Sequence, residues 1–127
     1  MQRGLLLFAH GARDPRWAEP FDAVAARVRS ADASLHVRLA YLEFMTPTLL
    51  EAGRDLALAG CDRVEIVPLF LGAGGHVRKD LPDLQRELEA AYPLVQWRLR
   101  QAVGELEPVI AAMADAAVRM ATEHSLE

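Results

Sequence analysis

The sequence predicts an α/β domain with three layers, α/β/α, built around a four-stranded parallel sheet of strand order 2-1-3-4. Residues 4–9 and 64–71 are almost continuous apolar runs, which are typical of central strands buried on both faces. Residues 35–41 and 95–99 alternate apolar with polar side chains, as edge strands do. A helical pattern follows each strand after a short connection, which favours parallel pairing with helices on both faces of the sheet. We expect a single domain spanning residues 1–127.

Two strand–helix units make up the first half of the chain. The strand at 4–9 is followed by Asp14-Pro15, a cap and a first-turn proline, which predicts a helix over 15–30. The strand at 35–41 is followed by Thr46-Pro47, which repeats this signal for a second helix. The buried face of that helix is expected to carry Leu49, Ala52, Leu56 and Ala59.

The second half repeats this order. The strand at 64–71 runs into a turn at 72–75 with three glycines, and Asp80 is then expected to cap a helix with Pro82 in its first turn. Tyr92-Pro93 should close this helix before the strand at 95–99. A last amphipathic helix is predicted from the spacing of Leu106, Val109, Ile110, Met113, Ala117 and Met120.

The composition favours a small-molecule or ion ligand. A net charge of −4 with scattered basic residues argues against a nucleic-acid partner. No apolar run approaches the roughly 20 residues that span a bilayer, and no cleavage-site pattern follows Met1, so we expect no membrane association and a cytoplasmic location. The single cysteine, Cys61, excludes an internal disulfide and is expected to be a packed thiol. Residues 125–127 carry no packing signal and are expected to form a tail outside the fold.

Two histidines and a glutamate are predicted to meet at one edge of the sheet. His10 and His76 follow the first and third strands, so both lie past the carboxyl ends of neighbouring central strands, where the winding direction reverses. Glu43 follows the second strand and should open on the same rim. Two imidazoles and a carboxylate suit a divalent first-row metal and leave positions for water or substrate. Each could instead be a packed or solvated residue, as we expect of His36 and His124.

The glycine-rich turn at 72–75 has a second interpretation. Such a turn before a helix can cradle phosphate, although this one lacks both the dinucleotide-binding spacing and a Walker lysine. The run at 10–13, His-Gly-Ala-Arg, also hints at a phosphotransfer histidine, but Ala9 stands where a second arginine would precede it. Four basic residues on the same rim could hold an anionic substrate or be solvated loop charges: Arg13, Arg16, Arg78 and Lys79.

At these positions the chain resembles the small, single-domain sirohydrochlorin chelatases of the CbiX/SirB type, which insert a metal ion into a modified tetrapyrrole. Three segments carry the resemblance: residues 6–15 (LLFAHGARDP), 41–47 (YLEFMTP) and 67–77 (VPLFLGAGGHV) with Asp80-Leu81-Pro82. The likeness covers nearly the whole length, with Ala12 where the family commonly has serine. It implies a flavodoxin-like fold equivalent to half of the larger two-domain chelatases, and a homodimer whose sites face the partner.

The resemblance also implies roles for individual residues. His10 and His76 match the metal-handling histidines and Glu43 the associated acid, so these three are the candidate catalytic residues and metal ligands. Histidine can deliver a metal ion or accept a pyrrole proton, while the glutamate can orient a histidine or take a proton. The tetrapyrrole is expected to rest against Gly11, Gly72, Gly74 and Gly75, with Arg13, Phe44 and Arg78 as further substrate contacts. The two arginines are chosen by position, because the substrate of such enzymes is a polycarboxylate.

The expected activity is therefore that of an ATP-independent class II chelatase, a lyase of cobalamin or siroheme biosynthesis. Its substrates would be sirohydrochlorin and a divalent metal, cobalt or iron with nickel as a further candidate, and no organic cofactor is expected. Histidine and carboxylate bind these ions alike, so the residues do not select among them. Two alternatives stay open: a non-catalytic metal or tetrapyrrole carrier that uses the same histidines, and a phosphate-handling enzyme of flavodoxin-like fold.

Overall fold

The computed structural model describes residues 2–72 and 74–123, with His76 described by its backbone alone. The strands are β1 (Arg3–Ala9), β2 (His36–Tyr41), β3 (Arg63–Pro68) and β4 (Gln96–Leu99). The α-helices are α1 (Glu19–Ala31), α2 (Leu49–Leu58), α3 (Gly75–Ala91) and α4 (Glu107–Thr122), and two 3₁₀ turns are η1 (Pro15–Ala18) and η2 (Val103–Glu105). No helix in these ranges is long and apolar enough to cross a membrane.

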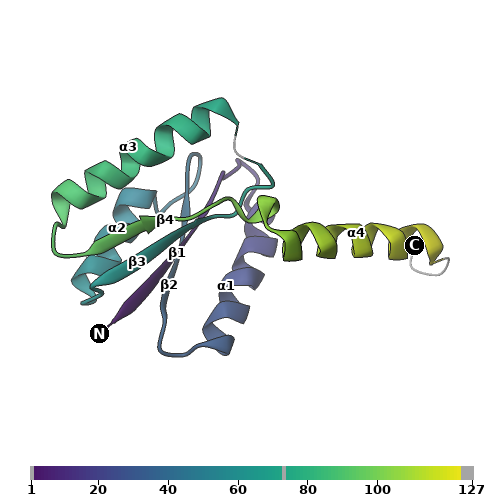
Figure 1. Ribbon diagram of the computed structural model, residues 1–127, viewed down its shortest axis with the longest axis horizontal. Coiled ribbons are helices and arrows are strands. Elements are labelled where there is room, and N and C mark those ends of the chain that lie inside the picture. The colour runs from purple at the N-terminus through teal and green to yellow at the C-terminus, as the bar shows by residue number, and fades with distance from the viewer. Residues whose placement is uncertain (1, 73, 124–127) are drawn as a thin grey trace.

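The four strands form one parallel sheet in the order β2-β1-β3-β4, which confirms the predicted order (Figure 1). The two most apolar strands lie at the centre, paired in a register that places Leu6 beside Ile66. Both side chains are fully buried, as is Phe8. Because all four strands run the same way, their carboxyl ends lie at the same end of the sheet, here called the carboxyl edge.

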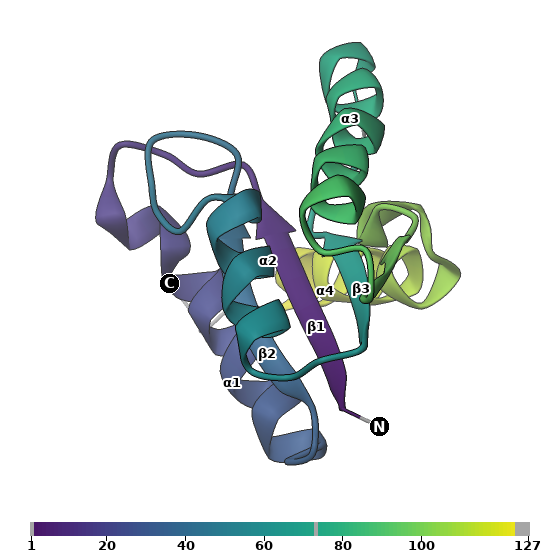
Figure 2. The same ribbon diagram turned by 90° about the vertical axis from the view of Figure 1, so that its left-hand side faces the viewer.

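Helices cover the two faces of the sheet unequally. One face packs against α2 and α3 through the larger core, which contains Leu56, Leu88 and Trp97. The other packs against α1 through a smaller core around Leu7, Ala25 and Val37. The predicted last helix forms, but none of its residues is buried and it projects away from the sheet (Figure 1). Figure 2, which looks along α4, shows this helix behind the strands. Among the described residues, α1, α2 and α3 therefore build the helical layers that we expected from four helices.

The structure corrects the start of the first predicted helix. Residues 15–18 form the 3₁₀ turn η1, and the α-helix begins only at Glu19. The expected cap is confirmed, since the Asp14 carboxylate accepts a hydrogen bond from the backbone N–H of Arg16 at 2.9 Å. Pro20 explains the break: it has no N–H to donate to the carbonyl of Arg16, and the N–H of Glu19 bonds there instead.

A second correction concerns the start of α2. The helix is capped by Thr48, not by Thr46 with Pro47. The Thr48 hydroxyl accepts from the N–H of Glu51 at 3.2 Å, and the Glu51 carboxylate accepts from the N–H of Thr48 at 2.8 Å. This reciprocal pair is a capping box, whose Thr-x-x-Glu spacing is visible in the sequence.

The largest correction concerns β3 and α3. The strand ends at Pro68 instead of residue 71, and α3 begins at Gly75 instead of near Asp80, so Pro82 lies inside the helix. Val77 is buried one turn before Leu81 on the same face, and we attribute the early start to its packing on the core, which offsets the hydrogen bond that Pro82 cannot make. His76 therefore lies in the first turn of a helix and not in a loop.

Candidate functional site

His10 lies directly after β1, one of the two central strands, and its ring packs on an aromatic side chain. The ring centroids of His10 and Phe70 are 4.3 Å apart with an angle of 33° between the planes. Phe70 is buried and belongs to the loop that follows β3, whereas His10 is exposed at the edge. No hydrogen bond to the His10 ring is formed by the residues that the structure describes. The stacking limits how the imidazole can turn and leaves its nitrogens available to a ligand.

The backbones of His10 and Glu43 are hydrogen-bonded neighbours. The N–H of Glu43 donates to the carbonyl of His10 at 3.0 Å, and the N–H of Leu42 donates to that of Ala9 at 2.9 Å. Gly11 makes this approach possible, because it has a φ of +87° and a Cβ there would lie 1.9 Å from the Glu43 carbonyl oxygen. Only glycine fits this position without displacing one of the two loops. The prediction that His10 and Glu43 follow strand ends on one rim is confirmed for their backbones.

Phe44 is held in an unusual conformation beside this pair. Its φ of +66° places a bulky residue in the left-handed region, and 56% of its surface is exposed. The guanidinium carbon of Arg13 lies 4.5 Å from the centre of its ring, a cation–π contact. Leu71, after Phe70, is 71% exposed on the loop that follows β3. Two large apolar side chains are thus presented to solvent on loops at the carboxyl edge of the sheet.

The glycines of the turn at 72–75 differ from Gly11. Among the residues that the structure describes, and apart from the chain neighbours and the backbone of α3 itself, no atom lies within 4 Å of a Cβ built on Gly72, Gly74 or Gly75, so packing against these residues does not require glycine there. Glycine here leaves the backbone open to close approach by a ligand. The backbone of His76 follows within the first turn of α3, but its side chain lies outside the described residues.

A complete metal site is not formed by the residues that the structure describes. Among them no group of three or more histidine, cysteine, aspartate or glutamate side chains is placed to hold a metal ion. His10 and Glu43 therefore do not make a metal centre with a third described residue. The predicted set of His10, Glu43 and His76 stays a prediction, since one of its members lies outside this test.

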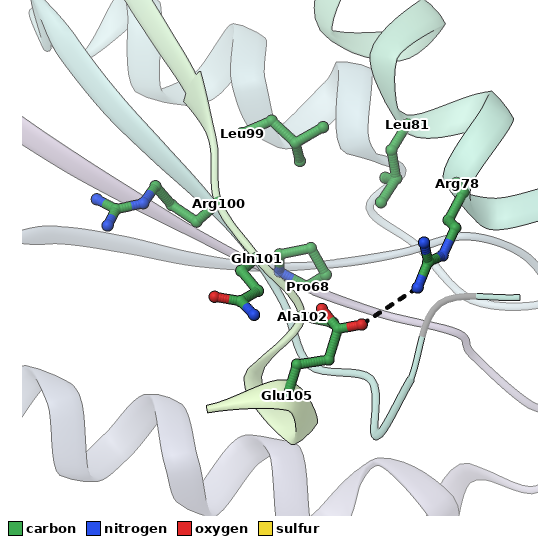
Figure 3. A pocket seen from close by; sticks show the side chains of 8 residues that line it. All are labelled: Pro68, Arg78, Leu81, Leu99, Arg100, Gln101, Ala102 and Glu105. Atoms are coloured by element: carbon green, nitrogen blue, oxygen red, sulfur yellow. Dashed lines mark hydrogen bonds and ion pairs between the residues drawn. The ribbon is translucent and has the colours of Figure 1, made fainter. Parts of the chain in front are cut away.

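A small pocket opens beside the site, between α3, the ends of β3 and β4, and η2. Its volume is about 270 Å³, and Arg78 reaches across it to the carboxylate of Glu105 at 3.3 Å (Figure 3). The same pocket is lined by Arg100, which pairs with Glu65 at 2.8 Å. Two arginines thus border one cavity near the carboxyl edge, each with a carboxylate beside it. Lining residues are Pro68, Arg78, Leu81, Leu99, Arg100, Gln101, Ala102 and Glu105.

Other candidate residues have structural roles or lie away from the edge. Arg16 bonds to the Asp14 carboxylate at 2.8 Å, which lowers the pKa of that carboxyl, so this arginine supports the cap of η1. Cys61 is buried, and burial raises the pKa of its thiol, which confirms the expected packed cysteine. His36 begins β2 at the opposite edge of the sheet, as predicted.

Sequence reasoning missed three residues that organise the site. The sequence predicts Phe70 and Leu71 within a buried strand, but both lie in the loop after β3, directly before the glycine turn. An aromatic residue next to such a turn is the signal that indicates a contact with the site. The third residue, Gly104, lies in η2. Its N–H donates to the carbonyl of Phe70 at 2.9 Å, and a Cβ there would lie 2.0 Å from the carbonyl oxygen of Leu71. No local pattern in the sequence indicates this contact between η2 and the loop that follows β3.

Curated relatives align with about two thirds of this chain. A sirohydrochlorin cobaltochelatase of Saccharolobus solfataricus is 40% identical over 81 residues, which cover 64% of this chain and 62% of that protein. A sirohydrochlorin cobaltochelatase of Methanococcoides burtonii is 30% identical over 81 residues, with the same coverage. The aligned part of this chain thus spans about three fifths of the length of these relatives.

Solved structures share the fold, and a family model matches the sequence. A cobalamin (vitamin B12) biosynthesis CbiX protein from Marinobacter aquaeolei VT8 superposes with a TM-score of 0.82 at 31% identity, covering 94% of this chain and 97% of that one. The sirohydrochlorin chelatase SirB from Bacillus subtilis subspecies spizizenii, in complex with cobalt, has a TM-score of 0.82 at 21% identity, covering 95% of this chain and 52% of that one, and supports the fold alone. The CbiX family model matches residues 4–120. This chain belongs to the CbiX family.

Proposed function

We propose that the chain is a sirohydrochlorin chelatase, an ATP-independent lyase that inserts a divalent metal, cobalt or iron, into a tetrapyrrole. The observation that carries this proposal is the exposed His10, stacked on Phe70 and hydrogen-bonded through its backbone to Glu43, at the carboxyl edge of the sheet. Curated relatives named sirohydrochlorin cobaltochelatase, one of them 40% identical over 81 residues, support the same activity.

The proposed chemistry divides between metal and protons. Insertion needs a metal ion that has lost part of its water shell beside the ring, and bases that remove the pyrrole N–H protons. In our proposal His10 and His76 bind the incoming ion or accept a proton, and Glu43 orients a histidine or takes a proton. The stacking of His10 on Phe70 supports this role, because a ring held in one plane presents its nitrogens in few directions.

The tetrapyrrole is proposed to lie against the edge formed by Gly11, Phe44 and the turn at 72–75. Exposed apolar surface on Phe44 and Leu71 favours a flat hydrophobic ligand, and the open space at Gly72, Gly74 and Gly75 leaves room for it. Arg13 and Arg78 are proposed to contact carboxylates at the ring's periphery. Arg13 lies over Phe44, and Arg78 lies at the pocket of Figure 3.

We further propose that two copies assemble as a homodimer with their carboxyl edges facing each other. The carboxyl edge of one domain can contact the tetrapyrrole from one side only, and the carboxyl edge of a second copy would enclose it from the other side. Independence of ATP, the absence of an organic cofactor, the identity of the metal and a cytoplasmic location stay predictions. A non-catalytic carrier stays the second candidate, since a carrier would use the same histidine.

The test is the rate of metal insertion measured by absorbance under anaerobic conditions, with Co²⁺, Fe²⁺ and Ni²⁺ supplied in turn. His10→Ala should lower the rate by roughly 100-fold or more, the usual effect of losing an acid–base group. His36→Ala is the matched control, because it removes the same side chain at the opposite edge of the sheet. Equal rates for the two variants would contradict the proposed site, and product that never exceeds one equivalent per chain would identify a carrier.

A further inference from the structure

The pocket of Figure 3 is an apolar recess with a charged mouth. Its walls come from Pro68 at the end of β3, Leu81 on α3, and Leu99 and Ala102 at and after the end of β4. Leu81 and Leu99 point toward each other across it (Figure 3). Its volume of about 270 Å³ is below the roughly 300–1,000 Å³ of pockets that hold a whole small-molecule ligand, so it suits one side arm of a larger molecule.

Of the two arginines that line the pocket, Arg78 is the one whose guanidinium reaches its mouth. It lies 3.3 Å from the carboxylate of Glu105, which comes from η2 on the opposite side (Figure 3). The guanidinium of Arg100 points away from Arg78 and pairs with Glu65 at 2.8 Å. Apolar walls that end in a guanidinium match a carboxyalkyl group, with its methylene chain in the recess and its carboxylate at the arginine.

The ion pair between Arg78 and Glu105 is weak enough for such a carboxylate to replace Glu105. The two side chains are 67% and 34% exposed, and an ion pair this exposed changes an equilibrium by at most about fivefold, because water solvates both charges nearly as well. The pair between Arg100 and Glu65 differs. Glu65 is only 23% exposed, and Arg63 and Arg98 also lie beside its carboxylate, at 3.3 and 3.9 Å. Glu105 is therefore the pocket carboxylate that a ligand can displace.

The recess lies within the reach of one macrocycle from His10. The loop after β3 separates the two places, and its Phe70 ring stacks on His10. On the other side, the carbonyl of Phe70 accepts a hydrogen bond at 2.9 Å from the N–H of Gly104, the residue before Glu105. β1, β3 and β4 are consecutive in the sheet, and neighbouring strands lie ~4.8 Å apart, so the ends of β1 and β4 are about 10 Å apart. A tetrapyrrole placed over His10 carries its carboxyalkyl arms at its periphery, a comparable distance from its centre.

We propose that this recess holds one carboxyalkyl arm of the tetrapyrrole, and that Glu105 occupies the carboxylate position at Arg78 until the arm displaces it. The inference rests on the proposed function for the identity of the ring. It goes beyond Arg78 as a carboxylate contact, because it assigns the apolar walls to the arm and names the competing carboxylate. Glu105 is thus a specificity-determining residue: a ring without an acidic arm at this position has no charge with which to displace it.

Titration of the chain with metal-free sirohydrochlorin, followed by absorbance, tests the displacement without depending on metal insertion. Glu105→Gln removes the competing charge and should lower the Kd for the tetrapyrrole by roughly two- to fivefold. Arg78→Gln should raise this Kd by roughly tenfold or more, the effect of losing a hydrogen bond between charged groups. In the double variant the gain in affinity from Glu105→Gln should vanish, because the guanidinium for which the two carboxylates compete is gone.

Glu107→Gln is the matched control, because it removes one negative charge two residues away, in the first turn of α4 and outside the pocket. A Kd that is unchanged or raised by Glu105→Gln would overturn the displacement. An equal decrease for Glu107→Gln, or a decrease that persists in the double variant, would overturn it as well. Circular dichroism verifies that each variant folds.

Insertion of Co²⁺, measured on the same samples, separates this inference from the proposed function. The expected order of Kd values without metal insertion would contradict the chelatase alone. Metal insertion by a wild type whose Kd does not respond to Glu105→Gln would overturn the recess alone. A wild type that does not bind the tetrapyrrole would contradict both.

Discussion

Gly11→Ala tests the contact that joins the His10 and Glu43 loops. Gly11 has a φ of +87°, and a non-glycine residue in that region costs about 1–2 kcal/mol. In addition, the new Cβ would lie 1.9 Å from the Glu43 carbonyl oxygen, where real Cβ contacts begin near 3.0 Å. The two backbones must therefore separate by about 1 Å. That movement breaks the 3.0 Å hydrogen bond from Glu43 to His10, worth about 1 kcal/mol.

The expected total is a loss of about 3 kcal/mol in the free energy of unfolding, or about 10 °C in melting temperature for a domain of this size. Gly60→Ala is the control, because Gly60 has a similar φ of +93° and its Cβ would have open space, with its nearest neighbour at 3.9 Å. Gly60→Ala isolates the cost of the positive φ from that of the steric clash, and it should lower the free energy of unfolding by only about 1–2 kcal/mol. Equal melting temperatures for the two variants would refute the steric argument. If the proposed function holds, a shift of about 1 Å between His10 and Glu43 should also slow metal insertion by roughly 100-fold.

Three further predictions concern other parts of the molecule. Burial alone would raise the pKa of Glu65, but hydrogen bonds from Arg100 and Arg63 and the charge of Arg98 lower it. Glu65→Gln should therefore lower the free energy of unfolding, measured with urea at neutral pH, by about 1–2 kcal/mol. This difference from the wild type should disappear as the pH falls through the lowered pKa. Gly104→Ala should lower the melting temperature and broaden the NMR signals of Phe70, because its Cβ meets the backbone of Leu71; an unchanged spectrum would contradict the close packing. Gly72→Ala should leave the melting temperature unchanged, as the position is open, yet raise KM for the tetrapyrrole; unchanged KM would exclude close approach there.

The sequence alone was enough for the order of the sheet. Continuous apolar runs in β1 and β3 and alternation in β2 and β4 report directly how many faces of each strand are buried, and that number separates central from edge strands. Once the order is known, the carboxyl ends must share an edge. The placement of His10 and Glu43 on that edge follows from chain topology and needs no knowledge of side-chain packing.

The start of α3, the stacking of His10 and the direction of α4 depend on contacts between residues that are distant in sequence. The early start of α3 depends on Val77 packing in the core, which a local reading of Asp80 and Pro82 as a helix start could not include. The stacking of His10 on Phe70 joins two loops sixty residues apart. Local patterns show which face of an element is apolar, but not which surface covers it. For that reason the sequence predicts that the last helix has an apolar face but not what this face contacts. The tertiary structure shows that the packing of Gly104 on Leu71 directs α4 away from its own sheet, so that its apolar face does not pack there.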